Sequence, residues 1–286
     1  MGLRIQNNIE AFNTHRQLSN TAMLAGKSME KLSSGYRINR AADDAAGLAI
    51  SEKMRAQIGG LAQAQRNAQD GISLVQTAEG SLTEVHSMLQ RIRDLKIQYD
   101  GGTLNDDDKV AVAAEVSQIT QEIAAIVDPT SGTQFNGKPL FVGTGFTFQV
   151  GANNGETVST QSASLSGAIT GGGLSGITNI TTASAASVAF NAGGDLASVA
   201  TIDEAIKNVS KVRADFGAVQ NRLEHRLNNL ATYQENLTAS ESRIRDVDMA
   251  AEMTKFTKLQ ILQQAGTSML AQANQSPQNV LSLLRQ

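Results

Sequence analysis

Residues 201–245 decide the fold, and they read TIDEAIKNVSKVRADFGAVQNRLEHRLNNLATYQENLTASESRIR. Large apolar residues recur through this stretch at spacings of three, four or seven residues. They are Ile202, Ile206, Val209, Phe216, Leu223, Leu227, Leu230, Leu237 and Ile244. Such spacing places these side chains on one face of a helix. Because the stripe is longer than about 25 residues, it predicts coiled-coil-like packing against other helices.

The N-terminal part of the chain carries the same kind of pattern, with stripes in residues 18–36, 68–92 and 112–126. Between the last two stripes, residues 99–108 read YDGGTLNDDD. The paired glycines there indicate a helix end, and the three aspartates indicate a solvated N-terminal cap of the next helix. The sequence therefore predicts long helices up to about residue 128 and again from residue 201.

Residues 129–200 differ in composition from both ends of the chain. From Pro139 to Gly194 the only charged residue is Glu156. Residues 143–150 alternate between apolar and polar side chains, and Asn153–Gly155 are typical of a hairpin turn, so this part predicts short strands. Residues 159–194 are small and polar, which fits either a short β region or a surface loop.

The composition favours long helices over a compact enzyme. Aromatic residues make up 4% of the 286 residues, and there are only three prolines and no cysteine. The absence of cysteine removes disulfides, thiolate metal sites and cysteine nucleophiles. The three histidines lie far apart and form no H-E-x-x-H pair, so we expect no catalytic, cofactor-binding or metal site.

Charge and hydropathy exclude further classes of partner. The net charge of −3 gives no basic patch for nucleic acid. The sequence contains no run of about 18 apolar residues, so we expect no membrane insertion. The polar faces of the expected helices are nearly neutral, which argues against a membrane-active amphipathic helix. The first twenty residues lack the apolar core of a cleavable signal peptide. If the protein leaves the cell, we expect it to use another route.

The two ends of the chain predict self-association. Two lone terminal helices share only one seam, so their apolar residues cannot all be buried within one chain, and we expect these ends to become ordered when many copies assemble. The apolar residues expected to drive polymerisation are Ile5, Ile9, Phe12, Leu18, Leu32, Phe256, Leu259, Leu262, Leu270, Leu281 and Leu284.

Four segments of the chain resemble the signature motifs of bacterial flagellins, the subunits of flagellar filaments. Near the N-terminus they are KLSSGYRINRAADDAAGLAI (31–50) and NAQDGISLVQTAEG (67–80). Near the C-terminus they are SRIRDVDMA (242–250) and LAQANQSPQNVLSLL (270–284). Two long motifs at each end, in the correct order, make the resemblance specific.

The resemblance implies a mainly α fold, in which long coiled-coil-like helices from both termini pack as a hairpin-like rod with a small β-rich outer segment. Residues 1–43 and 246–286 would form the inner domain that lines the filament channel. Residues 44–158 and 195–245 would form a helical rod domain with a β-hairpin region. Residues 159–194 would be a short variable surface insert.

The resemblance also implies a function and partners. The chain would polymerise into the filament used for swimming, as a secreted, extracellular part of the bacterial flagellum. Its partners would be other copies of itself, the type III export apparatus, an export chaperone, the filament cap and the hook-junction proteins. The alternative within the same axial family is a hook–filament junction protein, which would form a short ring layer instead of a long polymer.

One further site comes with the resemblance. Arg91, Leu95 and Glu115 match family positions recognised by the vertebrate Toll-like receptor for flagellin. Arg91 and Leu95 are four residues apart on one helix face, and an antiparallel return of the chain would bring Glu115 near them. The alternative interpretation is a solvated Arg and acid beside a core leucine.

Two smaller features allow two interpretations each. Asp43 and Asp44 precede a helix, so they are either helix caps or part of a connection between domains. Gly59, Gly60, Gly71 and Gly80 interrupt a helical pattern, and either close packing of neighbouring subunits or simple tolerance explains them.

Overall fold

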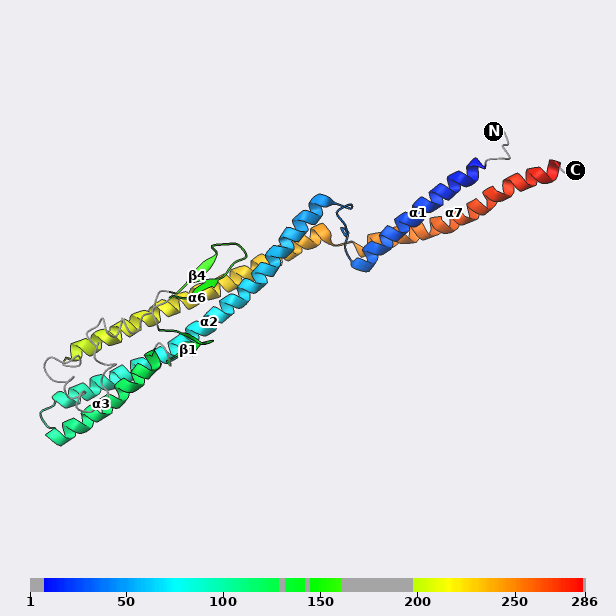
Figure 1. Ribbon diagram of the computed structural model, residues 1–286. Helices are drawn as coiled ribbons and strands as arrows, with labels where there is room; N and C mark the ends of the chain where they lie inside the picture. Colours follow the sequence, from blue (N-terminus) through cyan, green and yellow to red (C-terminus); the bar gives the residue numbers. More distant parts are fainter. Residues whose placement is uncertain (1–7, 129–131, 142–144, 161–197, 285–286) are drawn as a thin grey trace. The chain divides into compact units, whose positions relative to one another are not determined.

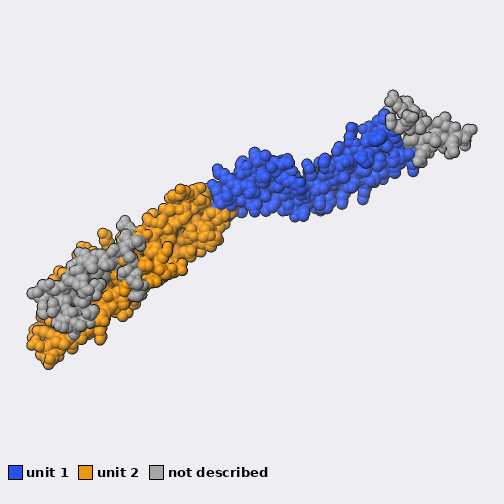
Figure 2. All heavy atoms as spheres, viewed as in Figure 1, with its two compact units in different colours: residues 1–57, 235–286 blue, residues 58–234 orange. Residues whose placement is uncertain are grey.

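A computed structural model describes residues 8–128, 132–141, 145–160 and 198–284. The chain divides into two compact units, coloured separately in Figure 2. Unit 1 comprises Met1–Gln57 and Glu235–Gln286, and unit 2 comprises Ile58–Gln234. Unit 1 combines the two ends of the chain and unit 2 holds the part between them, with the divisions after residues 57 and 234.

Long helices dominate the described residues, and two small antiparallel hairpins accompany them (Figure 1). The helices are α1 (Ile9–Ser34), α2 (Ala45–Asp100), α3 (Asp106–Val127), α6 (Val199–Arg245) and α7 (Met249–Leu284). The strands are β1 (Gln134–Phe135), β2 (Lys138–Pro139), β3 (Thr147–Gln149) and β4 (Thr157–Ser159). The mainly α fold with paired terminal helices and a small strand-containing segment is therefore confirmed. Within the range 143–150, where the sequence predicts a strand, β3 covers Thr147–Gln149, and residues 143–144 lie outside the described part of the chain.

Polar side chains define where the helices begin. Asn105 and Asp108 form a reciprocal capping box at the start of α3, which confirms the cap predicted for the acidic run. Asp44 caps α2, because its carboxylate accepts a hydrogen bond from the backbone N–H of Gly47 at 2.9 Å. Asp43 instead accepts from two backbone N–H groups of the preceding loop. These hydrogen bonds lower the pKa of the Asp43 carboxyl.

Unit 2 has a continuous apolar core, built by the stripes that the sequence predicts. Its fully buried members include Leu89 from α2, Val116 from α3 and Leu223 from α6. Leu140 and Val158, from the two hairpin regions, join the same core. Each helix contributes one apolar face, so the three-helix arrangement follows directly from the heptad spacing.

Two ion pairs at the edge of this core show the relative directions of α2 and α6. Arg93 pairs with Asp203 at 2.7 Å, and Glu79 pairs with Arg213 at 3.6 Å. The partner on α6 has the lower number where the residue on α2 has the higher one, so the two helices run antiparallel. α3 returns along α2 after the turn at residues 101–105, as the sequence predicts.

The β3–β4 hairpin explains two of the helical glycines. A Cβ at Gly60 would lie 3.1 Å from the Cβ of Ala152, and one at Gly71 would lie 3.2 Å from the ring of Phe148. Both neighbours belong to the hairpin region, so these glycines permit close packing within the chain. Gly59 and Gly80 have open space around them.

Within unit 1, α1 and α7 lie side by side and run antiparallel (Figure 1). The side-chain amide of Asn8 donates to the carbonyl of Ala273 at 2.7 Å, near one end of the pair. The hydroxyl of Ser28 donates to the carboxylate of Glu252 near the other end. The insert predicted at 159–194 lies outside the described residues, apart from its first two positions.

Candidate functional site

The candidate site is the terminal helix pair of unit 1 together with the joint from which it starts. At the joint, the chain leaves α1 through Gly35, whose φ of 76° is the left-handed conformation that glycine adopts most readily. The connection from α6 to α7 runs alongside. The N–H of Arg37 donates to the carbonyl of Arg245 at 2.7 Å, and the N–H of Val247 donates to the carbonyl of Gly35 at 3.0 Å.

Arg245 is the central side chain of this joint. Its side chain is 11% exposed, and its guanidinium lies 4.7 Å from the ring centroid of Tyr36. A guanidinium over an aromatic face at this distance makes a cation–π contact. One of its terminal nitrogens also lies 3.1 Å from the carboxylate of Glu52 on α2. The Nε atom of Arg245 is buried and has no hydrogen-bond partner among the described residues.

The interface between α1 and α7 is narrow and contains small side chains. Its buried members are Ala25 and Ser28 from α1, with Leu259 and Ala273 from α7. Leu18 faces Gly266 across the pair, where a Cβ would lie 3.2 Å from the Leu18 side chain. Small residues let the two helices approach closely, but they bury little apolar area.

One carboxylate is held inside this interface. Glu252 has a side chain that is 12% exposed, and it accepts hydrogen bonds from Ser28 and from Lys255 at 3.3 Å. Burial raises the pKa of the Glu252 carboxyl, but the two hydrogen bonds and the positive charges of Lys255 and Lys31 outweigh burial, so the net pKa is lowered.

Many large apolar side chains of the pair point away from the interface. Phe12 is 70% exposed, Ile9 is 56% exposed and Leu262 is 46% exposed. Further exposed members on the two helices are Met23, Leu24, Met29, Met249, Met253, Ile261 and Met269. Exposed apolar surface on this scale is typical of a protein–protein interaction site.

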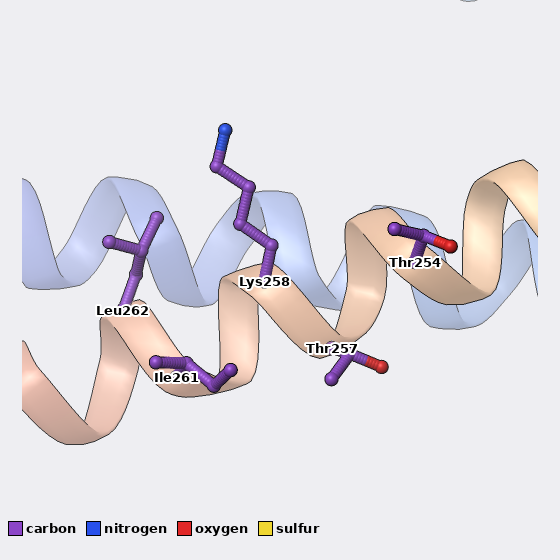
Figure 3. Close-up of a pocket in the computed structure, with 5 residues that line it drawn as sticks. All are labelled: Thr254, Thr257, Lys258, Ile261 and Leu262. Atoms are coloured by element: carbon purple, nitrogen blue, oxygen red, sulfur yellow. The ribbon is translucent and has the colours of Figure 1, made fainter.

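A shallow hollow of about 460 Å³ lies along α7 within this surface, lined by Thr254, Thr257, Lys258, Ile261 and Leu262. Figure 3 shows Thr257 and Ile261 on the side of α7 that faces away from the neighbouring helix. The Ile261 side chain is 61% exposed, so its apolar atoms are available to another molecule.

The structure places the expected polymerisation residues in three groups. Leu259 is buried between the helices, and Leu18, Leu32, Phe256 and Leu270 are half-buried. Ile9, Phe12 and Leu262 are exposed. Ile5 lies outside the described residues, and Leu281 and Leu284 belong to the described backbone of α7.

The three residues matched to receptor recognition lie in unit 2. The Arg91 guanidinium pairs with the Glu115 carboxylate at 2.6 Å, and the two side chains are 53% and 43% exposed. The antiparallel return of α3 thus brings these two residues together. Leu95 is 1% exposed and belongs to the core, so it adds no exposed apolar surface beside Arg91. The core position of Leu95 follows from its spacing, because it lies three residues beyond Ile92 in the same stripe.

Sequence reasoning missed two polar contacts of unit 1. The Arg245–Tyr36 contact and the Ser28–Glu252 contact each join residues about 200 positions apart, which a local pattern does not reveal. A signal for the second was present, since Glu252 is the only carboxylate side chain in residues 249–286. A lone acid on a largely apolar helix indicates a specific partner.

A metal site and a membrane-spanning helix each have requirements that the described residues either meet or do not meet. Among the described residues, no group of three or more His, Asp or Glu side chains could hold a metal ion. The helix Asp106–Val127 is the single described helix that is long and apolar enough to cross a membrane, which is weak evidence for a span. Its apolar residues Val112, Val116 and Ile123 lie in the core of unit 2, as in the core helix of a globular unit.

Comparison with protein families gives two matches that together cover most of the chain. Residues 5–145 match the bacterial flagellin N-terminal helical region, and residues 199–284 match the bacterial flagellin C-terminal helical region. Among solved structures, the crystal structure of Bacillus cereus flagellin is 30% identical and covers 58% of this chain and 88% of its own, with a TM-score of 0.46.

Curated relatives match over almost their whole length. The flagellin of Bacillus subtilis (strain 168) is 49% identical, covering 99% of this chain and 100% of the relative. The flagellin of Halalkalibacterium halodurans is 52% identical, and the flagellar filament 33 kDa core protein of Treponema phagedenis is 46% identical, each covering 98% of this chain and 99% of the relative. With both family regions present in order and paired terminal helices that leave apolar surface open, this chain belongs to the bacterial flagellin family of structural filament subunits.

Proposed function

We propose that the chain polymerises through the outward apolar surface of α1 and α7, and that these helices become ordered as copies assemble. The observation that carries the proposal is the exposure of Ile9, Phe12 and Leu262 on a helix pair that has a narrow interface of its own. In a polymer, neighbouring copies would cover these side chains and remove their apolar area from water. The relatives named as flagellar filament core proteins support the same role.

The exposed part of α7 supports assembly by helix packing. Thr254, Thr257 and Lys258 bring polar atoms beside the apolar Ile261 and Leu262 in one shallow hollow (Figure 3). A helix of a neighbouring copy fits such a surface, because the side chains that line it are spaced three and four residues apart along α7, and rows with this spacing interdigitate with those of another helix. A second copy of the chain, which presents the same surface, is the occupant that the filament role requires.

The test is assembly of the purified full-length chain, induced by salt and observed by electron microscopy. We expect filaments whose length grows with time and protein concentration. Growth that stops at a short ring layer would support the hook–filament junction alternative, which the flagellin relatives do not favour. A chain that stays monomeric under all assembly conditions would contradict the proposal.

The matched family suggests further partners and a location. We propose that the chain is secreted through the type III export apparatus with an export chaperone, and that it contacts the filament cap and the hook-junction proteins. The absence of cysteine is compatible with export of an unfolded chain, since no disulfide can form on the way. Secretion into culture medium that stops when the export apparatus is deleted would test this step.

We also propose that Arg91 and Glu115 take part in recognition by the vertebrate Toll-like receptor for flagellin. The pair is exposed at the surface of unit 2 and presents a planar guanidinium beside a carboxylate. Leu95 would act indirectly from the core, by holding the α2 backbone beneath Arg91.

A further inference from the structure

We propose that Arg245 is a positioning residue, which fixes the geometry of the joint from which α1 and α7 start. The inference rests on the proposed function, since a joint of fixed geometry lets every copy present the same outward surface. It is carried by the contacts of one buried side chain with two other segments of the chain.

Arg245 links three segments within unit 1. Its guanidinium stacks on Tyr36 in the α1–α2 connection and pairs with Glu52 on α2. The residue itself ends α6 one turn before α7 begins. The backbone adds two hydrogen bonds between the same connections, from the N–H of Arg37 to the carbonyl of Arg245 and from the N–H of Val247 to the carbonyl of Gly35. The side chain and the main chain therefore join the same two segments.

The energetics indicate a role in specificity more than in stability. Moving a cation out of water is unfavourable, and the buried Nε of Arg245 has no described hydrogen-bond partner. The partner carboxylate of Glu52 is 60% exposed, and an ion pair with one exposed member contributes little. A buried charge without a full set of hydrogen bonds is tolerated in only a few conformations of the surrounding chain. The conformation seen here is one of them, because the guanidinium of Arg245 stacks on the Tyr36 ring.

Because Glu52 is exposed, the role of Arg245 can be tested by substitution. Replacing Arg245 by methionine removes the charge, keeps much of the apolar volume and leaves Glu52 with access to water. The substitution therefore strands no buried carboxylate. Any loosening of the joint then reports the loss of the guanidinium contacts themselves.

A neighbouring arginine provides the matched control. Arg243 lies two residues earlier on α6 and is exposed, and the hydrogen bond described for its side chain is to Ser240 on the same helix at 2.9 Å. Arg243→Met changes the same residue type on the same helix without touching the joint. Arg245→Lys keeps the positive charge but lacks the planar group that stacks on Tyr36.

The experiment measures hydrogen–deuterium exchange at the joint amides of Arg37 and Val247, in filaments of the full chain. We expect exchange at least tenfold faster in Arg245→Met than in wild type, an intermediate rate in Arg245→Lys and the wild-type rate in Arg243→Met. Tyr36→Leu should reproduce the fast exchange, whereas Tyr36→Phe, which keeps the ring, should not. The melting temperature of Arg245→Met should stay near that of wild type, which separates a positioning role from a loss of overall stability.

Wild-type exchange rates in both Arg245→Met and Tyr36→Leu would overturn the inference. If Arg245→Met forms no filaments, the same amides are compared in the unassembled chains of wild type, Arg245→Met and Arg243→Met. Faster exchange confined to Arg245→Met then supports the inference, and equal rates overturn it. If the wild-type chain itself does not assemble, that result contradicts the proposed function alone, and the joint amides are then compared in the unassembled chains of the same variants.

Discussion

The two units of this flagellin use their apolar residues in opposite ways. In unit 2, the stripes of α2, α3 and α6 meet in one continuous core, and Leu89, Val116 and Leu223 are almost completely shielded from water. In unit 1, the described apolar residues that are buried are Ala25, Ile38, Leu259 and Ala273, while Ile9, Phe12 and Leu262 are exposed. Unit 2 therefore has a core of its own within one chain, whereas in the proposed polymer the cover of the terminal helices comes from neighbouring copies.

Truncation of either end of the chain should give the largest difference between the two units. Deleting residues 1–30 or 257–286 removes one partner of the α1–α7 pair, and we expect filament formation to be abolished. Unit 2 should keep its helical circular dichroism and a cooperative thermal transition, because its core contains none of the deleted residues. Filaments of normal length from either truncated chain would contradict the contrast between the units.

Single apolar substitutions should show the same contrast at smaller magnitude. Leu89→Ala removes a side chain that is 0% exposed, and we expect unfolding of unit 2 to become easier by about 2–5 kcal/mol. Phe12→Ala removes a larger side chain that is 70% exposed in the single chain, so the monomer should change by less than about 0.5 kcal/mol. Its effect should instead appear as a higher protein concentration needed for assembly. Denaturant unfolding and sedimentation of filaments measure the two quantities.

Much of this contrast could be predicted from the sequence, because heptad spacing reports which side chains share a face. The stripes predict the buried positions of α2, α3 and α6, and the YDGGTLNDDD turn predicts where α2 ends and α3 begins. The spacing of Leu95 from Ile92 fits its core position, but the sequence left open whether Leu95 would instead form an exposed patch with Arg91. The contacts of Arg245 with Tyr36 and of Glu252 with Ser28 depend on the path of the chain between distant segments, which no local pattern contains.

The proposed receptor site on the surface of unit 2 can be tested with a single substitution and a matched control. We expect Arg91→Ala to weaken receptor signalling by the monomer at least tenfold, equivalent to about 1.4 kcal/mol, because it removes a planar, permanently charged group. Arg93→Ala is the matched control, since Arg93 also pairs with an acid, Asp203, at the edge of the same helix. Receptor-reporter activity over a dose series of folded monomers measures both. Equal potency of Arg91→Ala and wild type would remove Arg91 from the site.

The Arg91 prediction also depends on whether the polymer covers the site. If neighbouring copies cover Arg91 and Glu115, filaments should signal poorly compared with monomers at equal protein mass. A wild-type monomer that is silent at every dose would remove the receptor assignment altogether.

The smallest expected effect concerns two glycines of α2 that differ in what surrounds them. Gly80 has open space where a Cβ would lie, so Gly80→Ala should stabilise unit 2 by about 0.5–1 kcal/mol through the better helix propensity of alanine. At Gly71 a Cβ would lie 3.1 Å from Leu223 and 3.2 Å from Phe148, two side chains packed in or against the core. Gly71→Ala should therefore give no gain or a loss, because the crowding offsets the propensity term. Thermal unfolding of both variants measures the difference, and an equal gain at the two sites would show that Leu223 and the hairpin pack more loosely on α2 than these distances imply.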